Sequence, residues 1–100
     1  MALYRVADEA SRDLEAIADY IMEDNPLRAV SFVEEITAKF ATIGERPLSF
    51  PHPDELPAEM RSALHGNYRI IFRVTKGTPE ILRVLHCARD LPTLLRDLEP

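Results

Sequence analysis

The clearest alternation of apolar and polar positions lies in residues 60–90. The runs Tyr68–Val74 and Ile81–His86 are rich in β-branched and aromatic residues, which is typical of half-buried strands. Glycines mark tight turns beside these runs, at Gly66-Asn67 and at Lys76-Gly77-Thr78-Pro79. The sequence therefore predicts a meander of three antiparallel strands, at about residues 60–65, 68–75 and 80–86.

Alternation along the middle strand divides its side chains into two sets. The apolar set is predicted to cover the helices and consists of Tyr68, Ile70, Phe72 and Val74. The second set is predicted to face outward and consists of Arg69, Ile71, Arg73 and Thr75. We therefore expect an open sheet face that carries arginines.

The first half of the chain predicts one short strand and a helix. Leu3–Val6 is a β-prone run, expected at an edge of the meander, and it stops at Asp8, a favourable helix N-cap. Apolar residues then recur at helical spacing, at Ala10, Leu14, Ile17, Ala18 and Ile21. We expect the first helix over about residues 9–23.

Asn25-Pro26 predicts the start of a second helix, because asparagine caps well and proline suits the first helical position. Its apolar stripe comprises Ala29, Phe32, Val33, Ile36, Phe40 and Ile43. Gly44 is expected to close the helix in the left-handed conformation. The connection between the helices is so short that they must form an antiparallel hairpin.

Prolines at positions 47, 51, 53 and 57 exclude both a helix and a central strand in the next segment. We expect a stiff surface loop, attached to the core by Leu48 and Phe50. After His86, Asp90 could cap a short C-terminal helix with leucines at helical spacing. The predicted fold class is α+β: one domain over residues 1–100, in which a helical hairpin packs on one face of an antiparallel sheet, in the order β-α-α-β-β-β.

Composition restricts the classes of protein. No apolar run approaches the roughly 20 residues of a membrane span, and charged residues follow the N-terminus at once. The single cysteine, Cys87, cannot form an internal disulfide, which agrees with a reducing compartment. We therefore expect a cytoplasmic protein with no membrane partner.

Charge is distributed unevenly along the chain. Residues 1–59 hold five basic and thirteen acidic side chains, a balance of −8, whereas residues 60–90 hold six basic and two acidic ones, a balance of +4. Such asymmetry is typical of a face that binds an anionic partner. The alternative is that the strand arginines only keep an exposed face in solution.

The histidines and the cysteine give little indication of a catalytic or metal site. His52 lies between two prolines and is expected to be an exposed loop residue, His65 receives no role, and His86 is interpreted as structural. Cys87 has no base and orienting group near it in the sequence. No histidine and cysteine spacing fits a metal, and no glycine-rich phosphate loop is present, so no cofactor is expected.

Four apolar residues widen the core stripes of the two predicted helices: Tyr20, Met22, Val30 and Ala41. One interpretation is a broad core face. The other is a groove over the hairpin that accepts a partner's helix. The sequence leaves both interpretations open.

The order of these elements resembles a known family. The segments that carry the resemblance are Asp13–Ile21, Pro26 at the second helix, Tyr68–Val74 and above all Ile81–Asp90. Together they resemble the RelE/ParE superfamily of bacterial toxins, on its ParE branch, over nearly the whole chain. The resemblance implies a type II toxin held inactive by a cognate antitoxin, usually ParD-like, whose ribbon-helix-helix part binds operator DNA.

The ParE branch implies growth arrest by poisoning DNA gyrase, without catalysis by the toxin. Under this hypothesis gyrase is the target partner, and operator DNA is contacted only through the antitoxin. The expected target-binding residues are Arg61, Arg69, Arg73, Arg83, Arg89 and Asp90. The expected antitoxin-binding residues are Leu14, Ile17, Tyr20, Ile21, Val30 and Val33.

The RelE branch implies the alternative, a ribosome-dependent mRNA endoribonuclease. Such cleavage needs an acid, a base and cations for the developing phosphorane charge. The candidate residues are Arg61, Arg69, Arg83 and His86. Nuclease members commonly carry a tyrosine or a histidine-tyrosine pair near the end of the last strand, where this chain has Arg89-Asp90, which favours the ParE hypothesis. A third hypothesis is a partner-binding module without toxicity.

Overall fold

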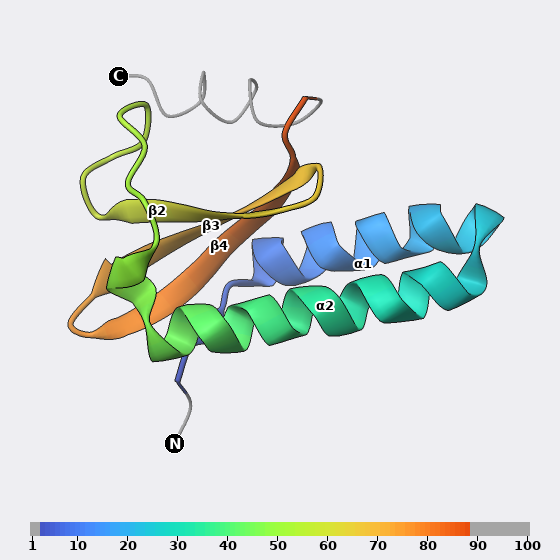
Figure 1. Ribbon diagram of the computed structural model, residues 1–100, viewed down its shortest axis with the longest axis horizontal. Coiled ribbons are helices and arrows are strands. Elements are labelled where there is room, and N and C mark those ends of the chain that lie inside the picture. The colour runs from blue at the N-terminus through green and yellow to red at the C-terminus, as the bar shows by residue number, and fades with distance from the viewer. Residues whose placement is uncertain (1–2, 89–100) are drawn as a thin grey trace.

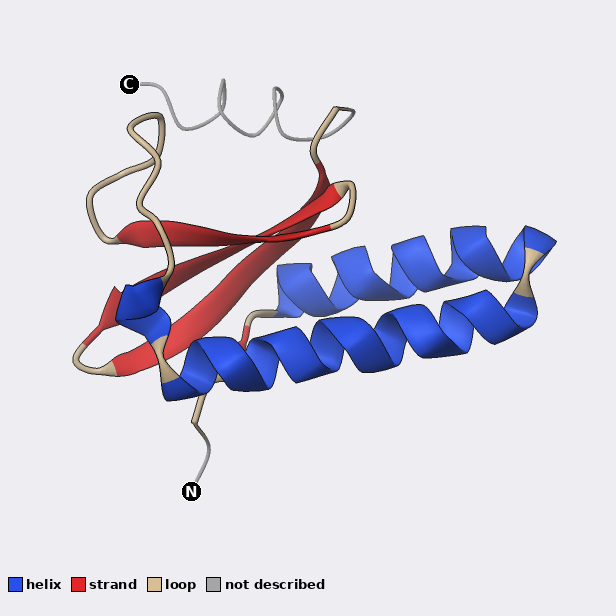
Figure 2. Cartoon of the chain, viewed as in Figure 1, coloured by secondary structure: helices blue, strands red, loops and turns tan. Residues whose placement is uncertain are grey.

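In the described part of the chain, a four-stranded sheet is covered on one face by a helical hairpin, as a computed structural model shows (Figure 1, Figure 2). The structure describes residues 3–88, so the predicted C-terminal helix lies outside the described residues. The predicted order β-α-α-β-β-β is confirmed, with the elements β1 (Arg5–Val6), α1 (Asp8–Asp24), α2 (Pro26–Glu45), a 3-10 turn (Pro47–Ser49), β2 (Met60–His65), β3 (Tyr68–Thr75) and β4 (Thr78–His86). Neither α1 nor α2 is long and apolar enough to cross a membrane.

The strands lie in the order β1-β4-β3-β2. The three strands of the meander are antiparallel, as predicted, and β1 takes the free edge of β4 as a parallel neighbour, with Arg5 opposite Glu80. The register shifts between Ile71 and Phe72, which pair with Arg83 and Ile81, so Leu82 is an extra residue on β4. This bulge keeps Ile81 and Val84 on the same face of the sheet.

The last turn is shorter than predicted. Lys76 and Gly77 have φ angles of 53° and 84°, which form a two-residue turn with both residues left-handed. Thr78 and Pro79 therefore already pair with β3, and β4 begins at Thr78 instead of Glu80.

The predicted start of α1 was wrong by one residue. Ala7, not Asp8, is the N-cap, and its N–H donates to the Ile81 carbonyl at 2.8 Å. The end of β1 therefore also fixes the start of α1. Asp8 and Glu9 lie in the first turn, where their charges favour the positive end of the helix.

The cap of α2 is confirmed, since the Asn25 side chain accepts a hydrogen bond from the Arg28 N–H at 3.1 Å. The prediction for Gly44 was wrong: it lies inside α2 and has no positive φ. Its role is close packing, because a Cβ at this position would lie 2.9 Å from the Leu3 Cβ and 3.0 Å from the Leu3 carbonyl oxygen. The segment before β1 passes over the last turn of α2 at this glycine.

The main core lies between the hairpin and the sheet. The predicted helix-facing residues of β3 all belong to it or pack against it. Most of the predicted helix stripes do so too, but Ala18, Ala29 and Val33 do not. Phe50 also packs here, with its ring edge-on to Phe72 at 5.9 Å between centroids, whereas Leu48 is 69% exposed and does not attach the loop. The buried core residues are Ala10, Ile17, Phe32, Ile36, Phe40, Ile43, Ala63, Ile70, Phe72, Ile81 and Val84.

The opposite face of the sheet, called the outer face here, is not open as predicted. Ile71 and Leu85 are buried on this face beneath Leu56, and Met60 packs beside them. The sequence pattern missed this second core because Leu56 lies in an irregular segment, where periodicity carries no information. The segment 51–59 thus lies against the outer face and the edge of β2.

Candidate functional site

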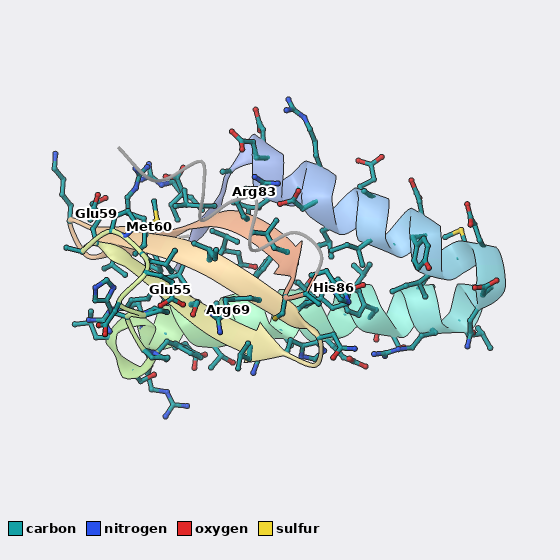
Figure 3. The ribbon with its side chains drawn as sticks, turned by 90° about the horizontal axis from the view of Figure 1, so that it is seen from above. Glu55, Glu59, Met60, Arg69, Arg83 and His86 are labelled. Carbon is teal, nitrogen blue, oxygen red and sulfur yellow. The ribbon has the colours of Figure 1, made fainter. Side chains whose placement is uncertain are left out.

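The arginines of the outer face are paired with carboxylates. Arg73 donates to Glu80 across the two strands at 2.8 Å, and the Arg69 Nη1 lies 3.7 Å from a Glu55 carboxylate oxygen. Figure 3 shows Glu55 beside Arg69 on this face. The predicted basic surface is therefore largely compensated by acidic residues from the segment 51–59 and from β4.

Arg83 is held by α1. Its Nε and Nη2 donate to the two carboxylate oxygens of Asp13 at 2.7 and 3.1 Å, and Glu9 lies 3.8 Å from its Nη1. The same Asp13 carboxylate accepts the backbone N–H of Val84 at 3.0 Å. Asp13 thus covers the edge of β4 where β1 has ended, a role that no pattern in the sequence could indicate because the partners lie 70 residues apart.

Arg61 does not share a face with the other arginines. It lies opposite Phe72, on the face that packs against the hairpin, and its Nη1 donates to the Phe50 carbonyl at 2.6 Å. It attaches the segment before β2 to the sheet. The structure therefore separates Arg61 from Arg69, Arg73 and Arg83 among the predicted target-binding residues.

His86 also lies on the hairpin side. It pairs with Tyr68 across the strands, and their rings meet edge-on at 5.3 Å between centroids. The four residues predicted for a nuclease are therefore divided: Arg61 and His86 lie on the hairpin side, and Arg69 and Arg83 lie on the outer face. Arg89 and Asp90 lie outside the described residues.

An apolar groove runs between the two helices on the side away from the sheet. It has a volume of about 270 Å³ and is called the hairpin groove, lined by Ala18, Met22, Ala29, Val30, Val33 and Glu34. Val30 is 55% exposed and Met22 49% exposed. Beyond it, Tyr20 and Leu27 are also exposed. These exposures contradict the interpretation of Tyr20, Met22 and Val30 as a broader core face.

The predicted antitoxin-binding residues are distributed over both sides of the hairpin. Val30 and Val33 line the hairpin groove and Tyr20 is exposed, whereas Ile17 is buried in the core. Leu14 and Ile21 pack against the same core. Helical periodicity finds apolar positions, but it does not tell which of two apolar sides another element covers.

A polar cluster joins α2 to the end of β2. Glu35 accepts two hydrogen bonds from the Arg28 guanidinium, at 2.6 and 3.3 Å, and one from the His65 Nε2 at 2.8 Å. The Arg28 hydrogen bond, followed by that of His65, lowers the pKa of Glu35 below its ordinary value. The hydrogen bond that Arg28 donates to Glu35 raises the pKa of the Arg28 guanidinium in turn. His65, which received no role from the sequence, thus connects the sheet to the hairpin.

Within residues 3–88, no three histidine, cysteine or acidic side chains gather closely enough to hold a metal ion. The candidate sites described so far in residues 3–88 are the hairpin groove, the paired arginines of the outer face and the Glu35 cluster.

Comparison with known proteins assigns the fold described above to a family. The family described as "ParE toxin of type II toxin-antitoxin system, parDE" matches residues 4–91. The chain belongs to this family. It is therefore the toxin component of a type II toxin-antitoxin system, as the sequence resemblance implied.

Two solved structures are similar to this ParE-family chain. A chain of the chromosomal ParDE system from P. aeruginosa has a TM-score of 0.73 and 22% sequence identity, covering 84% of this chain and 96% of that one, and shows the shared fold. A chain of the RelBE2 toxin-antitoxin complex from Mycobacterium tuberculosis has 30% identity and a TM-score of 0.55, covering 83% of this chain and 94% of that one. The comparison with curated proteins found no match.

Proposed function

We propose that this ParE-family toxin arrests growth by inhibiting DNA gyrase and that a ParD-like antitoxin neutralises it. The observation that carries the choice of target is the pairing of the outer-face arginines with carboxylates. A surface of paired charges suits recognition of another protein, where both signs find partners, better than it suits a polyanion.

The same geometry disfavours the nuclease alternative. Cleavage of RNA requires cations directed at one developing phosphorane and a proton-transfer group beside them. Here Arg83 is occupied by Asp13, Arg61 by the Phe50 carbonyl, and His86 lies on the other face from Arg69 and Arg83. These residues do not converge on a point where one phosphate could sit.

The hairpin groove is the proposed antitoxin site. Its apolar lining suits the apolar face of a helix, whose side chains recur every three to four residues. Glu34 lines the groove, and the exposed Asp19 and Glu23 directly follow its α1 lining residues Ala18 and Met22 in the sequence. An amphipathic helix with basic residues beside its apolar face is the complementary partner.

The test of the target is a supercoiling assay with purified gyrase and purified toxin, run beside a translation reaction in the same extract. We expect the toxin to reduce supercoiling or to trap cleaved DNA, with translation of a reporter mRNA unaffected. Codon-specific mRNA ends without any effect on gyrase would refute the proposal and establish the nuclease alternative. An antitoxin-saturated sample serves as the inactive control.

The test of the groove is a matched pair of substitutions on α2. Val30→Asp introduces a charge into the groove and should weaken binding of a ParD-like antitoxin by about tenfold or more, since an apolar anchor is lost and a carboxylate is desolvated. Ala38→Asp introduces the same side chain at an exposed position outside the groove and should change the affinity less than about twofold. Equal effects of the two substitutions would exclude this groove as the docking site.

A further inference from the structure

An irregularity in β4 directs Arg83 to the outer face. Leu82 is an extra residue at the register shift, so that Arg83 pairs with Ile71 and Ile81 pairs with Phe72. In a regular strand, residues 81 and 83 would share a face, and Arg83 would lie on the hairpin side with Ile81. Bulges reorient side chains in this way and are frequent beside functional sites. The bulge thus places a charged residue outward where regular alternation would have buried it.

Asp13 on α1 then fixes the orientation of the Arg83 guanidinium. The two Asp13 carboxylate oxygens accept hydrogen bonds from the Arg83 Nε and Nη2 at 2.7 and 3.1 Å, a bidentate arrangement that restricts the plane of the guanidinium. The carboxylate is itself held, because it accepts the Val84 N–H at 3.0 Å and its side chain is only 17% exposed. Arg83 therefore has one anchored orientation instead of the many rotamers of a surface arginine.

The other two arginines of the outer face are held less firmly. Arg73 donates from Nη2 to Glu80 at 2.8 Å, and the Arg69 Nη1 is 3.7 Å from a Glu55 oxygen, beyond hydrogen-bond distance. The Nε atoms of both are buried without a hydrogen-bond partner in the part of the chain that the structure describes. Arg83 is therefore the arginine of this face whose direction is set before a partner arrives.

We propose that Asp13 is a positioning residue for target recognition, which holds Arg83 in the orientation in which its guanidinium meets an acceptor group of the target protein. The Arg83 side chain is 31% exposed, so a protein that lies on the outer face can reach it. An arginine fixed before association loses less side-chain entropy than a mobile one. The inference rests on the proposed role of the outer face in target binding, and not on gyrase being the target.

The test is a double-mutant cycle on Asp13 and Arg83, measured as the concentration of purified toxin that halves supercoiling by gyrase. Asp13→Asn keeps one oxygen for the Val84 N–H but loses the charge and the second acceptor for Arg83. We expect it to raise this concentration about tenfold, and Arg83→Gln to raise it about tenfold or more. The double variant should match Arg83→Gln within about twofold, since Asp13 then has no arginine to position.

Two controls separate positioning from charge and from stability. Glu9→Gln removes the same charge from the same helix, but the Glu9 carboxylate lies 3.8 Å from the Arg83 Nη1 and is 68% exposed, so we expect a change of less than about twofold. Ile36→Val removes a methyl group from the main core and should also change inhibition less than about twofold, although it lowers the urea midpoint. Circular dichroism checks that each variant is folded at the assay temperature.

Arg83→Lys tests the orientation in a protein that retains Asp13. Lysine keeps the positive charge, but its compact ammonium group lacks the planar fork that both carboxylate oxygens bind. We expect inhibition to weaken about fivefold or more. This variant decides the inference if Asp13→Asn does not fold, because full inhibition by Arg83→Lys would show that the target needs only a charge at this position and would overturn the proposal.

Three further outcomes would overturn it. One is a folded Asp13→Asn protein that inhibits as strongly as the unchanged toxin, and another is full inhibition by Arg83→Gln. The third is a double variant in which the two losses multiply to about a hundredfold, which would mean that Asp13 acts independently of Arg83.

The choice of readout keeps this inference separate from the gyrase proposal. If the unchanged toxin leaves supercoiling unaffected, the gyrase proposal alone fails, and the same cycle is measured as the toxin level that halves the growth rate. A chain that affects neither gyrase nor growth would overturn both proposals.

Discussion

At the scale of single residues, Asp13 occupies the edge of β4 beyond the point where its pairing with β1 ends. β1 pairs with β4 only as far as Ile81, and the next outward backbone donor, the Val84 N–H, is bound by the Asp13 carboxylate instead. The same carboxylate holds Arg83 by two hydrogen bonds. One side chain on α1 therefore protects a sheet edge and fixes an arginine of the outer face.

The change Asp13→Ala should lower the free energy of unfolding by about 2–3 kcal/mol, because it leaves a backbone donor and an arginine without this partner. Urea denaturation monitored by circular dichroism measures the change. Asp19→Ala, an exposed position on the same helix, is the matched control and should cost no more than about 0.5 kcal/mol. Equal changes for the two variants would show that the contacts of Asp13 with Arg83 and Val84 add no measurable stability.

Glu35 gives a pH-dependent prediction. Its pKa is lowered from the ordinary value of 4.5 by hydrogen bonds from Arg28 and then His65, so its carboxylate stabilises the folded state above pH 4.5. This contribution is lost as the pH falls below 4.5 through the lowered pKa of the folded state. The urea midpoint of Glu35→Gln should lie below that of the unchanged protein at pH 7 and approach it on acidification. Glu34→Gln, at the neighbouring exposed carboxylate, should show no such convergence.

At the scale of elements, the irregular segment 51–59 packs against the sheet and is hydrogen-bonded to it. It bonds to the edge of β2, supplies Leu56 to the second core and places Glu55 beside Arg69. Its prolines exclude a regular strand. Two turns, closed by the Leu56 N–H to the Pro53 carbonyl and by the Met60 N–H to the Pro57 carbonyl, fold it against β2 instead. An irregular segment thereby converts an open sheet face into a partly covered one.

Two leucines of this region test the role of the segment. Leu56→Ala should lower the free energy of unfolding by about 2–3 kcal/mol, because Leu56 is 5% exposed and packs on Ile71 and Leu85. Leu48→Ala, at a leucine 69% exposed, should change it by less than about 0.5 kcal/mol. Denaturant melts measure the free energy of unfolding of both variants. A decrease of similar size for Leu48→Ala would contradict the packing assigned to Leu56.

At the scale of the whole molecule, folding compensates the charge asymmetry of the sequence. The basic residues 60–90 and the acidic residues 1–59 meet across tertiary contacts, as in Arg83 with Asp13, Arg69 with Glu55 and His65 with Glu35. The net result is a negative protein, at −5, whose strand arginines are engaged internally.

The toxin should therefore bind nucleic acid weakly by itself. We expect a dissociation constant above about 100 μM for a double-stranded 20-mer at physiological salt, because free phosphate-binding cations supply most non-specific affinity. The double variant Glu55→Gln/Glu80→Gln releases Arg69 and Arg73 and should bind more tightly, with a steeper salt dependence. Fluorescence anisotropy measures the DNA affinity of both proteins. Tight binding by the unchanged toxin would contradict the conclusion that carboxylates compensate its strand arginines.

The sequence by itself determined the elements, their order and the family. Periodicity found α1, α2 and the meander, because each element must place apolar residues at its own spacing against one core. Local chemistry determined the Asn25 cap and the Gly66 turn, since both depend on neighbours within a few residues. The charge asymmetry could also be read from the sequence, but the pairing of the opposite charges in the folded protein could not.

Only the tertiary structure decided how the candidate sites are built. It separated Arg61 and His86 from Arg69 and Arg83, buried Ile71 beneath Leu56, and assigned Gly44 to a close contact with Leu3 instead of a helix end. Each of these features depends on residues that are distant in the chain and meet only after the hairpin packs on the sheet. Local patterns record spacing within an element, whereas the pairing of charges and the covering of a face depend on which other element arrives there.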